Sequence, residues 1–147
     1  AEPLFRRALK IRETALGPDH PDTGKSLGNL ALFLQKKGDL DAAEPLFRRA
    51  LKIRETALGP DHPDTGKSVG NLASFLQKKG DYDAAEPLFR RALDIHDMVF
   101  GTNHEKTGEI AHSLVELLEK QGKRNEADKF LLKYARAIKS YQGDEDA

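Results

Sequence analysis

Apolar residues recur along the chain at spacings of three and four, the period of an α-helix that buries one face. The widest stripe begins after Asp39, stops at Gly59, and consists of Leu40, Ala43, Leu46, Phe47, Ala50, Leu51, Ala57 and Leu58. A second stripe follows Pro63, a residue that suits the first turn of a helix, and consists of Val69, Leu72, Ala73 and Leu76. The pattern predicts a helix A over about 63–79 and a helix B over about 82–100, each with equivalents 42 residues away.

The whole sequence repeats with this period. Residues 1–42 and 43–84 differ at three positions only, which are Leu27 against Val69, Leu32 against Ser74 and Leu40 against Tyr82. A fixed period of this length is typical of units that bury their apolar faces by stacking on their neighbours, so it predicts a solenoid. We expect an unpaired helix B over 1–16, repeats over 17–58 and 59–100, a divergent capping repeat over 101–142 and a disordered tail over 143–147.

Three places in the chain depart from a regular array. Pro45 and Pro87 lie inside helix B, where we expect a bend and no break because the apolar stripe continues through them. The chain starts with a helix B that has no helix A before it, so we expect a fragment of a longer array. At the other end we expect one capping helix with Ala127, Phe130, Leu131, Tyr134, Ala135 and Ile138 on one side.

Composition excludes several kinds of partner. The chain carries 24 basic and 24 acidic residues, so it lacks the cationic surplus that nucleic acid or an anionic membrane requires. It has no cysteine, which excludes disulfides and thiolate metal sites. No apolar run reaches the length of a membrane span and the N-terminus does not read as a signal peptide, so we expect a cytoplasmic protein.

Motifs that suggest catalysis have simpler interpretations. Residues 66–68, Gly-Lys-Ser, match the end of a phosphate-binding loop, but Asp61 stands where its first glycine belongs. His20, His62 and His104 recur in one turn of every repeat, so we interpret them as hydrogen-bonding residues that fix the turn. Nothing pairs a nucleophile with a base, and we expect no enzyme activity, no cofactor and no metal.

Small and apolar residues at fixed offsets resemble the tetratricopeptide repeat family. They are Leu30, Ala31, Leu34, Gly38, Ala43, Phe47 and Ala50 in one unit and Leu72, Ala73, Leu76, Gly80, Ala85, Phe89 and Ala92 in the next. The segment Leu-Gly-Pro-Asp-His-Pro-Asp-Thr, at 16–23 and 58–65, is similar to the long subclass found in kinesin light chains. The resemblance implies an all-α solenoid, a right-handed superhelix of antiparallel helix pairs with about seven helices, that binds proteins or peptides.

The same resemblance implies a concave groove lined by helix A. The groove positions that we expect to bind a peptide are Lys25, Asn29, Leu32, Gln35, Lys36, Lys67, Asn71, Ser74, Gln77, Lys78, His112 and Glu116. Asparagine can donate to and accept from a peptide backbone, and Gly28 and Gly70 open room for a close approach. One of the three differences between the first two units, Leu32 against Ser74, falls on this surface.

The sequence leaves two functions open. The first is a scaffold that binds an extended peptide, and the lysines of the first two units favour an acidic-leaning one. The alternative is a structural or self-assembling array, a spacer or oligomerisation module of a larger signalling protein. Because Leu4, Phe5, Ala8 and Leu9 lack the cover of a helix A, we also expect weak self-association through the N-terminal end.

Overall fold

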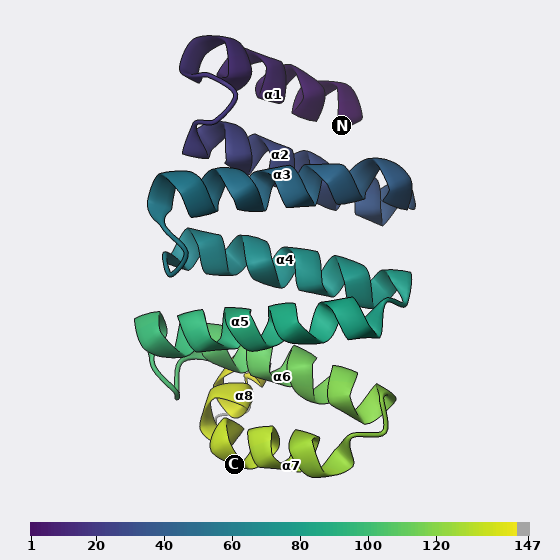
Figure 1. The fold of residues 1–147 in the computed structure, drawn as a ribbon, viewed down its shortest axis with the longest axis vertical. Helices are drawn as coiled ribbons and strands as arrows, with labels where there is room; N and C mark the ends of the chain where they lie inside the picture. Colours follow the sequence, from purple (N-terminus) through teal and green to yellow (C-terminus); the bar gives the residue numbers. More distant parts are fainter. Residues whose placement is uncertain (144–147) are drawn as a thin grey trace.

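The computed structural model describes residues 1–143, and these form a single stack of helices (Figure 1). The helices are α1 (Glu2–Leu16), α2 (Pro21–Lys37), α3 (Leu40–Leu58), α4 (Pro63–Lys79), α5 (Tyr82–Phe100), α6 (Glu105–Lys120), α7 (Arg124–Lys133) and α8 (Ala135–Gln142). The all-α solenoid is confirmed, and α4 and α5 have the bounds predicted for helices A and B. None of the described helices is both long and apolar enough to cross a membrane.

Every helix A begins with the same histidine cap. The Nδ1 atoms of His20, His62 and His104 each accept a hydrogen bond from the backbone N–H two residues on, at 3.1, 3.0 and 3.1 Å. This bond satisfies one of the amides that a helix start leaves without a partner. The interpretation of these histidines as turn-fixing residues is therefore confirmed.

Helix B continues through its proline. Both α3 and α5 are unbroken helices with Pro45 or Pro87 inside them, as the uninterrupted apolar stripe predicted. A local bend at these prolines stays a prediction.

One continuous core joins the units. Buried apolar residues extend without interruption from Leu30 in α2 to Ile138 in α8. Aromatic rings make the same contact in successive units: Phe47 packs on Phe75 with ring centroids 5.3 Å apart, and Phe5 packs on Phe33 at 5.4 Å. Helices α3 and α5 are thus each held by the helix A that follows as well as by their own, which is how stacked repeats become stable.

A ladder of ion pairs follows one edge of the stack. A glutamate near the start of each helix B meets a lysine from the next unit at 2.7–2.9 Å: Glu2 with Lys37, Glu44 with Lys79 and Glu86 with Lys123. These hydrogen bonds lower the pKa of each glutamate and raise the pKa of each lysine. In the third unit the lysine comes from the loop before α7, so the contact is kept although the repeat is not.

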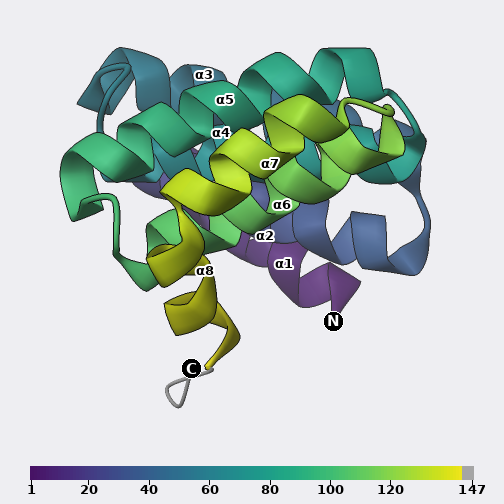
Figure 2. The same ribbon diagram turned by 90° about the horizontal axis from the view of Figure 1, so that it is seen from below.

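The prediction of one final helix was wrong, so residues 1–143 form eight helices where about seven were expected. The helix is interrupted at Tyr134, so α7 and α8 are separate helices (Figure 2). Tyr134 stands where the other units have Ala50 and Ala92, and the narrow helix crossing has no room there for a ring. The ring is buried where the helix breaks, and its hydroxyl donates to Asp97 at 2.8 Å.

The break lets α8 lie directly against α6. The backbone of Ala137 approaches Gly108 so closely that only glycine fits there. The tail predicted over 143–147 lies outside the described residues except for Gly143.

Candidate functional site

The predicted groove residues lie on one side of the A helices at spacings of three and four. Among those that α2 and α4 contribute, the lysines and Asn29 are exposed, while the remaining five are half-buried: Leu32, Gln35, Asn71, Ser74 and Gln77. The side-chain oxygen of Gln35 is enclosed and has no hydrogen-bond partner among residues 1–143. Most of this surface is therefore at least partly open to solvent, whereas the side-chain oxygen of Gln35 is enclosed.

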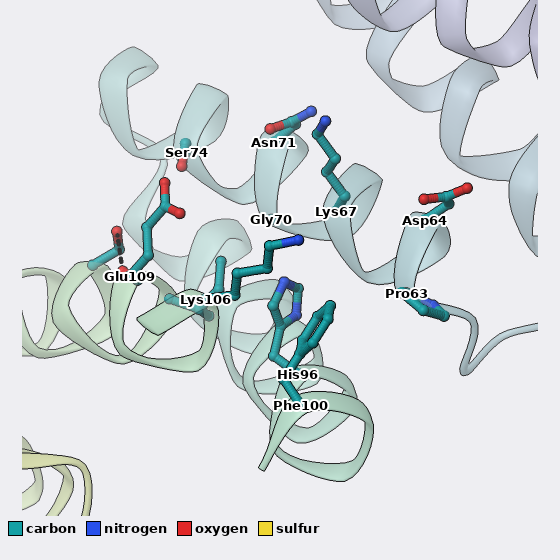
Figure 3. A pocket seen from close by; sticks show the side chains of 12 residues that line it. Pro63, Asp64, Lys67, Gly70, Asn71, Ser74, His96, Phe100, Lys106 and Glu109 are labelled. Carbon is teal, nitrogen blue, oxygen red and sulfur yellow. Dashed lines mark hydrogen bonds between the residues drawn. The ribbon is translucent and has the colours of Figure 1, made fainter. Parts of the chain in front are cut away.

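A pocket of about 430 Å³ interrupts this surface between α4 and α6 (Figure 3). Helix α4 contributes Pro63, Asp64, Lys67, Gly70, Asn71 and Ser74, helix α5 contributes His96 and Phe100, and the α6 segment contributes Lys106, Glu109, Ile110 and Ser113. Three predicted site residues, Lys67, Asn71 and Ser74, thus come together on one wall.

The pocket lies where the third unit departs from the first two. In the unit before it, Arg54 of α3 reaches across to α4 and donates to the hydroxyl of Ser68 at 3.0 Å and to the carbonyl of Asp64 at 3.2 Å. Arg12 makes the same pair of bonds one unit earlier. In the third unit His96 replaces this arginine and Ile110 replaces the serine, so the crossing side chain is lost. In the first two units an arginine fills the equivalent space. In the third unit this space, next to α6, is part of the pocket.

His96 forms the floor of the pocket in its neutral state. Its Nδ1 lies 2.8 Å from the carbonyl oxygen of Ala92, which can only accept, so Nδ1 carries the proton and Nε2 is left as an acceptor. Burial lowers the pKa of the imidazole, which leaves it uncharged at neutral pH. A neutral imidazole beside Phe100 makes this end of the pocket suitable for an uncharged group.

Charged groups line the rim. Lys67 and Lys106 supply two cations, and Asp64 and Glu109 supply two anions. The Lys106 ammonium also lies 4.9 Å from the centre of the Phe100 ring, a cation–π contact that holds both side chains at the pocket wall. The rim thus carries balanced charges around an uncharged floor.

Two glycines that look equivalent in sequence play different parts. A Cβ atom at Gly28 would meet nothing within 4 Å, so α2 is open there. A Cβ atom at Gly70 would lie 3.1 Å from the Ile110 side chain. Gly70 therefore accommodates the isoleucine of α6, whereas the space at Gly28 is open.

The predicted residues of the third unit lie away from the pocket. His112 Nε2 is 3.0 Å from the Glu116 carboxylate on the same helix, and the Tyr141 ring of α8 lies 6.0 Å from the His112 ring. Sequence reasoning also missed His96, Phe100 and Lys106 of the pocket lining. The signal was present in the comparison of units, since His96 and Ile110 replace Arg54 and Ser68.

The chain belongs to the tetratricopeptide repeat family, whose models match residues 1–22, 23–64 and 66–140. BtubC (BKLC) from P. vanneervenii has a similar structure, with a TM-score of 0.80, 22% identity and coverage of 100% of this chain and 57% of that chain. The nearly identical TPR-like repeats of a candidate kinesin light chain from Podosopora anserina match with a TM-score of 0.74 and 23% identity, covering 96% of this chain and 67% of that chain. MamA (MSR-1 C2) matches with a TM-score of 0.56 and 21% identity, covering 95% of this chain and 69% of that chain. No curated protein sequence matches the chain.

These structural similarities, at identities below 25%, establish a shared fold alone. The chain spans little more than half of BtubC. The likeness to kinesin light chain repeats that the loop sequence indicated is confirmed at the level of the family and its fold.

Proposed function

We propose that the helix A face binds an extended segment of a partner protein and that one side chain of this segment enters the pocket between α4 and α6. The observation that carries the proposal is the meeting of Lys67, Asn71 and Ser74 on the wall of a pocket with an uncharged floor. Tetratricopeptide repeats generally mediate protein interactions, and a solenoid uses its side-chain surface for this purpose. A chain without cysteine suits a reducing compartment such as the cytoplasm, where we propose that it acts.

The charges along the helix A face favour one orientation of the bound segment. The exposed Lys25, Lys36, Lys67 and Lys78 lie on α2 and α4, while Glu109, Glu116 and Glu119 lie on α6. Complementary charge selects partners and speeds their association. The segment that fits is acidic where it crosses α2 and α4, inserts an uncharged side chain at the pocket, and is neutral or basic beyond it.

Selection from a displayed library of random peptides tests this function. We expect the enriched peptides to share an acidic stretch next to an uncharged side chain, and to lose binding to the Asn29→Ala/Asn71→Ala variant. An Asn103→Ala/Asn125→Ala variant is the matched control, because these exposed asparagines lie in and just after loops outside the pocket. Enrichment of peptides that bind both variants equally would contradict the proposal.

We propose a second, weaker property, which is self-association through α1. The observation that favours it is the exposure of the apolar face of α1, where Leu4 is 70% and Ile11 is 56% exposed. Exposed apolar patches tend to find partners.

A further inference from the structure

The imidazole of His96 leaves one ring nitrogen without a partner. The side chain is 7% exposed, and its Nδ1 is bonded to the Ala92 carbonyl oxygen at 2.8 Å. No residue of 1–143 bonds Nε2, and this atom is not fully enclosed by protein, so it opens into the pocket that the ring lines. Figure 3 shows the tip of the ring directed into this space. A nitrogen buried in this way requires a donor, because an unpartnered polar atom loses the hydrogen bond that water would give it.

Two contacts hold the ring in this orientation. The carbonyl of Ala92 lies on the same helix, one turn earlier. On the other side, a Cβ atom at Gly66 would lie 3.2 Å from Cε1 and 3.3 Å from Nδ1 of His96, so the ring lies close against the backbone of α4. Nδ1 therefore keeps the proton, and Nε2 can only accept a hydrogen bond.

The second unit shows how the equivalent space is filled by the chain itself. There Arg54, which has only N–H donors, donates to the hydroxyl of Ser68 and to the carbonyl of Asp64. His96 stands at the position of Arg54 and Ile110 at the position of Ser68. The third unit thus has an acceptor where the second unit has donors. The missing donor has to come from outside the chain.

A cation supplies the complementary group at the same end of the pocket. The centre of the Phe100 ring lies 4.9 Å from the Lys106 ammonium and 5.5 Å from the centre of the His96 ring. The ammonium can only donate a hydrogen bond, whereas the free Nε2 can only accept one. A carboxylate has nothing to donate to Nε2, an alkyl group satisfies neither partner, and a second ammonium would be repelled by Lys106.

We propose that the pocket selects a side chain whose uncharged tip donates a hydrogen bond to His96 Nε2 and accepts one from Lys106, as a carboxamide or a hydroxyl does. Phe100 and Ile110 contact the carbon chain that carries this tip. The inference rests on the proposed function, since it names the chemistry of the side chain that the bound segment inserts.

Capped amino acids test the pocket without the rest of the segment. The probes are the N-acetyl methylamides of glutamine, methionine and glutamate, which are similar in shape, and of threonine and valine, which also match each other. Each probe is titrated into the full chain while the ¹⁵N signals of the backbone amides and of the imidazoles are followed by NMR.

We expect glutamine to bind about twofold to tenfold more tightly than methionine, or threonine than valine, which is the effect of one neutral hydrogen bond. The first pair tests a carboxamide and the second a hydroxyl. The Nε2 signal of His96 should shift with the probe that donates and stay in place with its apolar counterpart.

Two variants locate the hydrogen bond. His96→Phe keeps a ring but removes Nε2, so the advantage of the donating probes should disappear. His96→Arg combined with Ile110→Ser restores the crossing of the second unit and fills the pocket, so no probe should bind. This double variant is the matched control, because the chain already folds with the same pair at Arg54 and Ser68.

Equal binding within both pairs would overturn the proposal, as would an advantage of the donating probes that persists in His96→Phe. Glutamate that binds more tightly than glutamine would overturn it too, because Lys67 and Lys106 would then act by charge alone. Peptides that bind the helix A face without a donor at the pocket would contradict this inference and leave the proposed function intact. If no peptide binds that face, the proposed function fails, and the probe titrations alone decide the chemistry of the pocket.

Discussion

At the scale of single residues, the turn between helix B and helix A is built three times from the same atoms. The hydroxyls of Thr23, Thr65 and Thr107 donate to the carbonyls of Gly17, Gly59 and Gly101 at 2.7, 2.8 and 2.8 Å. These buried bonds fix the angle at which each helix A leaves the turn. The third unit keeps this turn, but a few substitutions in it create the pocket and the break between α7 and α8.

Substitutions at glycine separate tight packing from open space. We expect Gly108→Ala to cost at least about 1–3 kcal/mol, because the added methyl group meets the backbone of Ala137. Gly28→Ala should instead stabilise the chain by up to about 1 kcal/mol, since alanine is the better helix former and nothing lies within 4 Å of the new atom. Urea denaturation of both variants measures the two effects. Equal destabilisation would contradict the packing described for these glycines.

The buried imidazole of His96 makes stability depend on pH in a defined direction. Burial lowers its pKa from the ordinary 6.5, so the unfolded chain binds its proton first. The contribution of neutral His96 to the free energy of unfolding is therefore complete above about pH 6.5 and declines as the pH falls through that value. We expect the free energy of unfolding to fall less between pH 7 and pH 5 in His96→Gln than in the unsubstituted chain. Parallel pH profiles in urea titrations would refute this.

At the scale of helices, the repeated pattern predicted those features, such as helix bounds and caps, that depend on one segment and its neighbours in the sequence. Helices α4 and α5 follow from their apolar stripes, from Pro63 at the start and from Gly80 as a left-handed cap. The pocket did not follow, because it requires His96 and Ile110 to meet across two helices. The break at Tyr134 depends on the space at one helix crossing, which periodicity does not describe. Departures from the repeat, compared unit by unit, carry this information.

Equivalent phenylalanines test the stacking of helices. Phe47 is 2% exposed between α2 and α4, whereas Phe5 is half-buried in the end helix. Phe47→Ala should cost about 3–5 kcal/mol because it leaves a cavity. Phe5→Ala should cost much less, because the end helix can separate locally. Denaturant melts give both values, and equal losses would be incompatible with a stacked array.

At the scale of the whole molecule, the two ends of the stack differ. At the C-terminal end of the described residues α8 packs on α6 and Leu132 of α7 is exposed, while α1 at the N-terminal end leaves Leu4 and Ile11 exposed. The ion-pair ladder runs along the stack from Glu2 to Lys123. Its exposed pairs add orientation more than stability, since such pairs contribute little individually.

Light scattering over a concentration series measures self-association directly. We expect a mass that rises above 16.3 kDa with concentration, because the apolar face of α1 is partly buried in the associated form. Leu4→Lys combined with Phe5→Lys should return the mass to that of the monomer. A mass that is independent of concentration in the unsubstituted chain would rule out this association.

Binding of a partner segment to the helix A face can be measured by calorimetric titration. A peptide selected on the unsubstituted chain is titrated into that chain and into the Asn29→Ala/Asn71→Ala variant. Two lost polar contacts of about 0.5–1.5 kcal/mol each predict an affinity lower by about fivefold to 150-fold. Melting should change little, because Asn29 is exposed and Asn71 is only half-buried. Full affinity in the double variant would contradict binding at this face and assign it to another.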